Sequence, residues 1–96
     1  MVLGKVIGSV WATRKDDKLK NLKFLIVRHL NFDMTFKDSF SVAVDAVGAG
    51  AGEIVLTASG SSARLTELTD KKPVDTVIMA IVDKLDVDPA WNKDEI

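Results

Sequence analysis

The chain contains no cysteine, no tyrosine, a single histidine and only two prolines. Without cysteine it forms neither a disulfide nor a thiolate metal site. Zinc needs three or four ligands at set spacings, and His29 has no such companions in the sequence. We therefore predict no metal and no other cofactor. The absence of cysteine also fits a reducing compartment, so we expect a cytoplasmic protein.

Long hydrophobic runs are absent as well. The longest uninterrupted apolar stretch covers residues 77–82, whereas a membrane-spanning helix needs about 20 residues. The first residues lack the basic and then apolar order of a signal peptide. We therefore predict no membrane association. Hydrophobic residues nevertheless make up 47% of the chain, a share that excludes intrinsic disorder.

The chain is also short, and this limits its core. Its 96 residues form one domain, and a domain of this size buries only about 60–65% of its unfolded surface. Since neither disulfides nor metals add stability, oligomerisation is the natural source of further burial.

The small net charge conceals an uneven distribution. Residues 1–28 carry seven Lys/Arg and two Asp, a balance of +5, and residues 29–96 carry six and twelve, a balance of −6, which sum to −1. These charges are either scattered over the surface or form complementary patches that meet across copies of the subunit. The overall balance gives no field that attracts nucleic acid.

Apolar and turn residues alternate in a way that predicts five short strands. We expect them at residues 2–13, 22–30, 40–47, 53–58 and 78–87. Ser61 or Ser62 is expected to cap a short helix that ends near Glu67, and Pro73 to begin a helical turn through Thr76. Five strands in so short a chain favour a closed or partly closed barrel, because closure removes exposed strand edges. The predicted fold class is mainly β.

The second predicted strand and the loop after it are both rich in apolar residues. The strand at 22–30 places Leu25, Val27 and His29 on one face, and the opposite face is largely apolar too. Apolar residues on both faces predict that the core covers one side and a partner covers the other. The loop predicted at 31–39 carries Phe32, Met34 and Phe36. These side chains either contact a neighbouring protein or cover the end of the barrel.

Glycines and alanines alternate just before the fourth predicted strand. The run comprises Gly48, Ala49, Gly50, Ala51 and Gly52, followed by Glu53. The spacing is not that of a nucleotide-binding loop, and the P-loop lysine is missing. The run predicts either an ordinary hairpin loop or a loop packed near a symmetry axis, where other copies approach closely.

The segment Gly60-Ser61-Ser62-Ala63-Arg64 superficially resembles a nucleophile elbow. Arg64 stands where the motif requires glycine, and the chain is too short for the large sheet that carries such elbows. A Ser–His29–Asp45 triad would use the only histidine with nothing to fix its geometry. We predict no catalytic residue. A serine hydrolase acting through Ser62 remains a minor alternative.

Five segments, taken in order, carry a resemblance to one known family. They are residues 1–15, 22–27, 42–53, 59–64, and 73–75 with 81–83. Together they resemble the CcmL/EutN family, the pentameric vertex proteins of bacterial microcompartment shells. The resemblance covers residues 1–87, which we take as the domain, and leaves 88–96 as a C-terminal tail.

The resemblance implies an oligonucleotide-binding-like (OB-like) β-barrel that assembles as a pentameric ring with a narrow axial pore. It implies a structural protein and not an enzyme, located in a microcompartment shell. Its partners would be further copies of itself and hexameric shell proteins, with no nucleic acid and no membrane. The alternative function is an OB-like module that binds single-stranded nucleic acid, for which the basic first third of the chain is suited but the aromatic residues are sparse.

The resemblance also places ten residues near the ring interface or the pore. They are Gly48, Ala49, Gly50, Ala51, Gly52, Glu53, Gly60, Ser61, Ser62 and Arg64. Arg64 is expected to pair with a neighbouring carboxylate such as Glu53. Trp91, which lies between charged residues in the tail, is expected to dock on an adjacent subunit.

Overall fold

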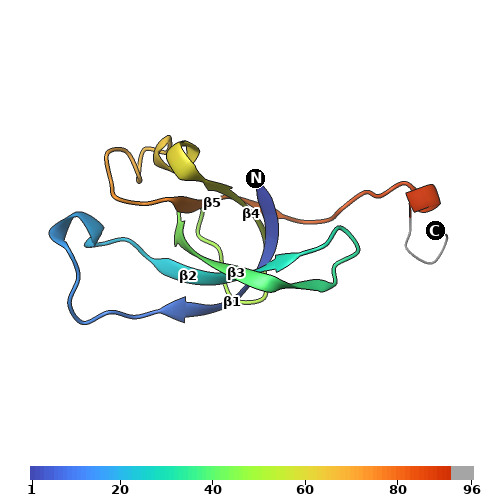
Figure 1. The fold of residues 1–96 in the computed structure, drawn as a ribbon, viewed down its shortest axis with the longest axis horizontal. Helices are drawn as coiled ribbons and strands as arrows, with labels where there is room; N and C mark the ends of the chain where they lie inside the picture. The colour runs from blue at the N-terminus through green and yellow to red at the C-terminus, as the bar shows by residue number, and fades with distance from the viewer. Residues whose placement is uncertain (92–96) are drawn as a thin grey trace.

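Five strands close into a small barrel in the computed structural model, which describes residues 1–91 (Figure 1). The strands run in the order β1-β2-β3-β5-β4 around the barrel. All neighbours are antiparallel except β3 and β5, which are parallel. Their bounds are β1 (Val2–Val10), β2 (Phe24–Leu30), β3 (Phe36–Asp45), β4 (Ile54–Ser59) and β5 (Thr76–Val82). The predicted mainly-β, five-stranded barrel is confirmed.

Strand β3 begins four residues earlier than predicted. The prediction that residues 36–39 belong to a loop is therefore wrong. Phe36 pairs with Leu30 across a tight hairpin. In the turn, the Thr35 backbone N–H donates to Asp33 Oδ1 at 3.0 Å, and Met34 adopts a positive φ of 71°. The turn is short, and the aromatic and charged residues that follow it already belong to the strand that pairs with β2.

The other strand ends follow from their partners. β1 ends at Val10, which pairs with Phe24, the first residue of β2. β5 ends at Val82, which pairs with Ile54, the first residue of β4. The prediction that this strand continues to residue 87 is wrong. The alternating pattern after Val82 resembles a strand, but β4 offers no backbone for these residues to pair with.

Helical structure in the described residues is limited to three short 3₁₀ turns. They are η1 (Asp17–Leu19), η2 (Gly60–Arg64) and η3 (Pro89–Trp91). The helix predicted near residue 61 is therefore shorter than expected. Its N-cap is Ser59, which makes no side-chain capping bond, so the predicted capping by Ser61 or Ser62 is wrong. The helical turn predicted at 73–76 is also wrong, because this segment leads directly into β5.

The hydrophobic core has two parts. One cluster fills the barrel and comprises Val6, Leu25, Val27, Ala43, Ala49, Val55 and Ile78. The other lies between the barrel wall and the excursion formed by residues 60–75, and comprises Leu22, Val44, Ala58, Ala63, Val74 and Val77. This second cluster covers the outer side of β2 and β3 near Phe24 and Val44, and it leaves Ile7, Phe40 and Val42 farther along β1–β3 exposed.

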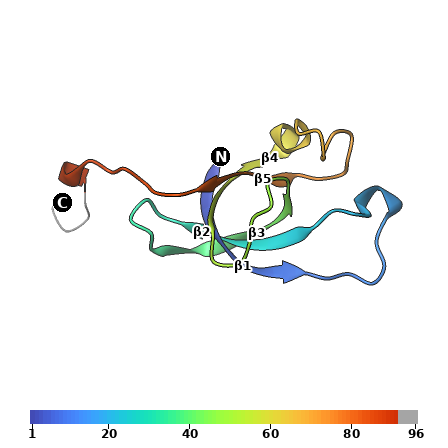
Figure 2. The ribbon, with the colours of Figure 1, turned by 180° about the vertical axis from the view of Figure 1, so that it is seen from behind.

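After β5 the chain leaves the barrel as a projecting arm. Figures 1 and 2 show it at the end opposite the β1–β2 loop, and the molecule measures 51 × 24 × 20 Å. Of the tail predicted at 88–96, residues 92–96 lie outside the described part. Within residues 1–91, we find no helix long and apolar enough to span a membrane.

Candidate subunit interface

The alanine–glycine loop is held by the carboxylate that precedes it. Asp45 ends β3, and its Oδ1 accepts the backbone N–H groups of Val47, Gly48 and Ala49 at 3.0, 3.0 and 3.1 Å. Gly48 has a φ of +78°, a conformation that side chains disfavour. Sequence reasoning missed this role of Asp45, although an aspartate three residues before a glycine is a recognisable turn signal.

The second half of the same loop is fixed against β1. The Gly50 N–H donates to Glu53 Oε1 at 2.6 Å, and the Gly52 N–H donates to the Val6 carbonyl at 2.8 Å. Ala49 is buried in the barrel core, whereas Ala51 is exposed. The loop is therefore rigid, and it presents small groups to its surroundings. Glu53 already uses one carboxylate oxygen within its own loop.

Side-chain hydrogen bonds from Thr69 and Arg64 hold the η2 turn in place. The hydroxyl of the buried Thr69 donates to the Ala63 carbonyl at 2.6 Å. Arg64 donates through Nη1 to the Val74 carbonyl at 3.3 Å. Ser61 and Ser62 are exposed. Sequence reasoning missed Thr69, whose role depends on a contact six residues away.

The structure separates the two predicted loop segments within one chain. Glu53 directly precedes β4 and Gly60 directly follows it, and β4 spans six residues. At about 3.3 Å per residue, the segments lie about 20 Å apart. Arg64 and Glu53 of the same chain are therefore too distant to pair. Contact between them is possible only across two copies and remains a prediction.

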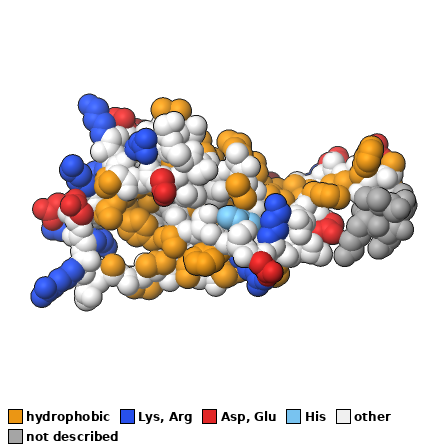
Figure 3. Space-filling view, in the orientation of Figure 1, with side chains coloured by type: hydrophobic (Ala, Val, Ile, Leu, Met, Phe, Trp, Pro, Cys, Tyr) orange, Lys and Arg blue, Asp and Glu red, His pale blue; other side chains and the backbone are white. Residues whose placement is uncertain are grey.

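The outer side of β1, β2 and β3 carries a set of uncovered apolar side chains. We call this the β1–β3 face and define it by Ile7, Ile26, Phe40 and Val42. Phe40 is 63% exposed, Ile7 51% and Val42 44%. Figure 3 shows hydrophobic side chains gathered over this part of the barrel. Isolated exposed apolar residues are ordinary, but a contiguous apolar face indicates an interaction site.

Strand register explains why these residues share a face. Val42 pairs with Ile26, two positions along from the pair formed by Phe40 and Arg28. The β1–β2 register shifts at Ile7, between the pairs made by its two neighbours, and this bulge adds Ile7 to the outer side. Leu25 and Val27 point into the core. The expectation that strand 22–30 has two apolar faces is confirmed.

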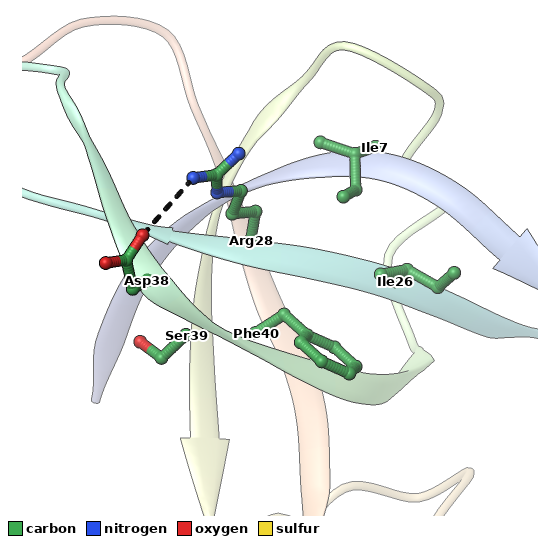
Figure 4. Close-up of a pocket in the computed structure, with 6 residues that line it drawn as sticks. All are labelled: Ile7, Ile26, Arg28, Asp38, Ser39 and Phe40. Carbon is green, nitrogen blue, oxygen red and sulfur yellow. Dashed lines mark ion pairs between the residues drawn. The ribbon is translucent and has the colours of Figure 1, made fainter.

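A hollow opens in the β1–β3 face (Figure 4). It is lined by Ile7, Ile26, Arg28, Asp38, Ser39 and Phe40. The Arg28 guanidinium lies 4.5 Å above the Phe36 ring, and its Nε donates to the Lys37 carbonyl at 3.1 Å. Its Nη2 lies 3.9 Å from Asp38 Oδ1. An apolar centre with an arginine at its edge is the composition of a protein–protein interface.

His29 lies on β2 between two serine hydroxyls. Its Nδ1 is 2.8 Å from Ser39 Oγ and its Nε2 is 2.7 Å from Ser41 Oγ. Asp45, the aspartate considered for a triad, binds loop backbone instead. Among residues 1–91 no three His, Cys, Asp or Glu side chains gather as a metal site. The histidine therefore belongs to the strand pairing between β2 and β3.

Residues 1–83 match a sequence family described as "Ethanolamine utilisation protein EutN/carboxysome". The chain belongs to the EutN/CcmL family. Its match covers all five strands, the alanine–glycine loop and η2. The family resemblance inferred from the sequence is confirmed.

Relatives with defined names extend over nearly the whole chain. The carboxysome shell vertex protein CcmL of Thermosynechococcus vestitus is 40% identical over 88 residues, which are 92% of this chain and 89% of that protein. The bacterial microcompartment shell vertex protein GrpN of Rhodospirillum rubrum is 43% identical over 86 residues, 90% of this chain and 97% of that protein. The solved structure of pentameric GrpN matches with a TM-score of 0.82 at 41% identity, covering 91% of this chain and 98% of that chain.

These relatives are named as shell proteins and not as enzymes. Neither they nor the EutN/CcmL family description supports the nucleic-acid-binding alternative. The β1–β3 face has the composition of a contact surface, which agrees with relatives that are named as shell proteins.

Proposed function

We propose that this chain is a structural shell protein that assembles into pentamers and caps the vertices of a polyhedral bacterial microcompartment. The observation that carries the proposal is its membership of a family whose named relatives are shell vertex proteins, including a pentameric one. A sheet of hexagons cannot close into a polyhedron without five-fold positions. A pentamer therefore supplies curvature and seals a corner, and no catalytic group is required.

The distribution of apolar surface supports a ring. A closed ring needs two different surfaces that meet head to tail. The β1–β3 face is one of them. The outer side of β1, β4 and β5 is the other: there Leu3 pairs with Leu56 and Leu56 with Ala80, and all three side chains are only half-buried. We infer that these two sides meet between neighbouring subunits.

The test of this contact is the mass of the assembly in solution. Phe40→Asp places a charge in the centre of the β1–β3 face, and we expect the ring to dissociate into folded monomers. Phe32→Asp is the matched control, because Phe32 is 51% exposed but lies at the hairpin tip. Circular dichroism verifies that both variants stay folded. A Phe40→Asp variant that keeps the mass of the native ring removes the β1–β3 face from the interface.

The alanine–glycine loop and η2 are proposed to lie near the ring interface or the pore. Their rigidity and the small groups that they expose suit close approach between copies. Because the chain has no native cysteine, Ala51→Cys and Ser61→Cys provide clean cross-linking sites. We expect inter-subunit bonds from at least one of them under oxidation. Failure at both positions in an intact ring contradicts the placement.

Hexameric shell proteins are the proposed partners at the outer edges of the pentamer. We expect a mixture of this protein with a hexamer-forming shell protein to yield closed particles in electron micrographs. The hexamer alone is expected to give open sheets or tubes. Closed particles that form equally well without this chain contradict the vertex role.

A further inference from the structure

The last nine described residues extend away from the barrel. Residues 83–91, which we call the C-terminal arm, point away from the β1–β2 loop (Figures 1 and 2). The arm forms one end of the long axis of a molecule that measures 51 × 24 × 20 Å. Ordering an extended segment costs conformational entropy. An arm that buries little of its own surface therefore points to contact with another molecule.

The arm combines acidic and apolar side chains. It carries one lysine and three aspartates, a balance of −2, and it alternates between Leu85, Asp86, Val87 and Asp88. Asp88 Oδ1 accepts the backbone N–H of residue 90 at 2.9 Å, and the Asp88 carbonyl accepts the Trp91 N–H at 2.9 Å. This turn fixes the backbone of Trp91, whose side chain is 66% exposed.

The opposite end of the molecule offers a hollow of complementary character. Its volume is about 310 Å³. It lies where β1 leaves the barrel and β2 returns, and we call it the Trp11 hollow. It is lined by Ser9, Val10, Trp11, Ala12, Lys15, Asn21, Leu22, Lys23 and Phe24. The floor is mainly apolar, and the charged lining residues are both lysines.

The positive charge of the Trp11 hollow is not neutralised within the chain. Neither Lys15 nor Lys23 has a carboxylate within 4.0 Å among residues 1–91. The carboxylates of the adjoining loop are already engaged, since Asp17 pairs with Lys20 at 3.0 Å and Asp16 caps η1. The hollow thus presents an apolar surface with two free cations at its rim.

We propose that the C-terminal arm of one subunit docks into the Trp11 hollow of a second copy. Trp91 covers the apolar floor, and Asp86 faces the two lysines. The arm and the hollow lie at opposite ends of one chain, so the contact forms between copies. The hollow of the β1–β3 face fits the acidic arm less well, because it carries the fully exposed carboxylate of Asp38. This inference rests on the ring assembly proposed above and names a contact within it.

Cysteine cross-linking tests whether the two segments meet. The full-length double variant Ala12→Cys/Ala90→Cys places one thiol beside the hollow and one beside Trp91, in a chain without native cysteine. Oxidation is expected to give a ladder of linked chains up to the full ring on a denaturing gel. The matched control, Glu67→Cys/Ala90→Cys, moves the first thiol away from the hollow and is expected to give no ladder. A ladder of equal yield in both variants overturns the proposal.

A charge exchange tests the electrostatic part. Lys23→Glu and Asp86→Lys each place like charges together, and each alone is expected to raise the dissociation constant of the ring at least tenfold. The combined variant is expected to return within about threefold of the native value. Asp88 is left unchanged because it holds the η3 turn. Losses that simply add in the combined variant overturn the proposal.

Trp91→Ala tests the apolar part, with Leu65→Ala as its control, since Leu65 is 81% exposed and lies outside the hollow. We expect Trp91→Ala to raise the dissociation constant of the ring tenfold or more, and Leu65→Ala to leave it unchanged.

The native chain separates failure of this inference from failure of the proposed function. A monomeric native chain overturns both the proposed function and this inference. A native pentamer that is indifferent to Trp91→Ala overturns the arm contact and leaves the vertex function standing.

Discussion

A single carboxylate oxygen organises the loop that the family resemblance singles out. Asp45 Oδ1 receives three backbone N–H groups, and one of them belongs to the buried Ala49. Removal of that acceptor leaves the loop donors without their partner at the wall of the barrel core. The alanine–glycine loop therefore owes its shape to a residue outside the run of glycines.

We expect Asp45→Ala to lower the free energy of unfolding by about 1–3 kcal/mol, because a buried donor loses its acceptor. Asp45→Asn retains an acceptor oxygen and should lose less. Asp83→Ala serves as a control, since Asp83 is exposed and lies beyond β5. Urea denaturation of the three variants measures the difference. Equal stability of Asp45→Ala and Asp83→Ala would show that the loop does not depend on this carboxylate.

Two glycines of β1 give a second prediction, because they differ in the space around them. A Cβ at Gly4 would overlap Val27 Cγ1 and come within 3.0 Å of the Arg28 carbonyl oxygen, whereas one at Gly8 would meet only Ile26 Cδ1 at 3.6 Å. We expect Gly4→Ala to cost about 1–3 kcal/mol of folding stability through overpacking. Gly8→Ala should be close to neutral. Thermal melts compare the two, and similar melting temperatures would contradict the packing described for β1 against β2.

Among the elements, the excursion between β4 and β5 depends on a buried polar contact. The Thr69 hydroxyl lies within hydrogen-bond distance of both the Ala63 carbonyl and the Thr66 hydroxyl. This hydrogen bond holds η2 against the second core cluster, which includes Ala63. Without it the Ala63 carbonyl is buried without a partner.

Thr69→Val keeps the shape of the side chain and removes the hydroxyl, so we expect a loss of about 1–3 kcal/mol. Thr69→Ser keeps the hydroxyl and should lose less. Hydrogen exchange of the η2 amides is expected to quicken in the valine variant before the barrel strands are affected. Unchanged protection of residues 60–65 would contradict the anchoring role.

The strands were predictable from sequence to different degrees. The two faces of β2 follow from alternation, and the structure bears them out as far as Arg28, after which the register shifts and Leu30 is buried. The start of β3 could not be predicted in this way, because residues 36–40 are exposed and mix charged with aromatic side chains. Their pairing with β2 depends on a hairpin turn with a positive φ at Met34. The end of β5 is set by where β4 begins, which is a property of its neighbour.

In the candidate interface, too, some features follow from the local sequence and others depend on distant strands. The alanine–glycine loop was recognisable from composition alone, but its distance from η2 follows from their positions at the two ends of β4. Phe40 and Ile7 escaped notice because their exposure depends on register and on a bulge. Local patterns predict which residues form loops, whereas only the pairing of distant strands tells which side chains remain uncovered.

At the scale of the whole molecule, a small barrel leaves two apolar sides and a projecting arm without cover from its own chain. A chain of 96 residues has little stability to spare. On the proposal made above, burial of these surfaces between copies adds stability and gives the assembly its form. The ring is therefore the functional unit of this account, and its subunit number is the quantity that matters most.

Native mass spectrometry at moderate salt tests this claim most directly. The account predicts one dominant species at five times the chain mass of 10.4 kDa, and a shift of that species to monomer on Phe40→Asp. A native chain that remains a folded monomer at micromolar concentration, with the β1–β3 face open to solvent, would contradict it.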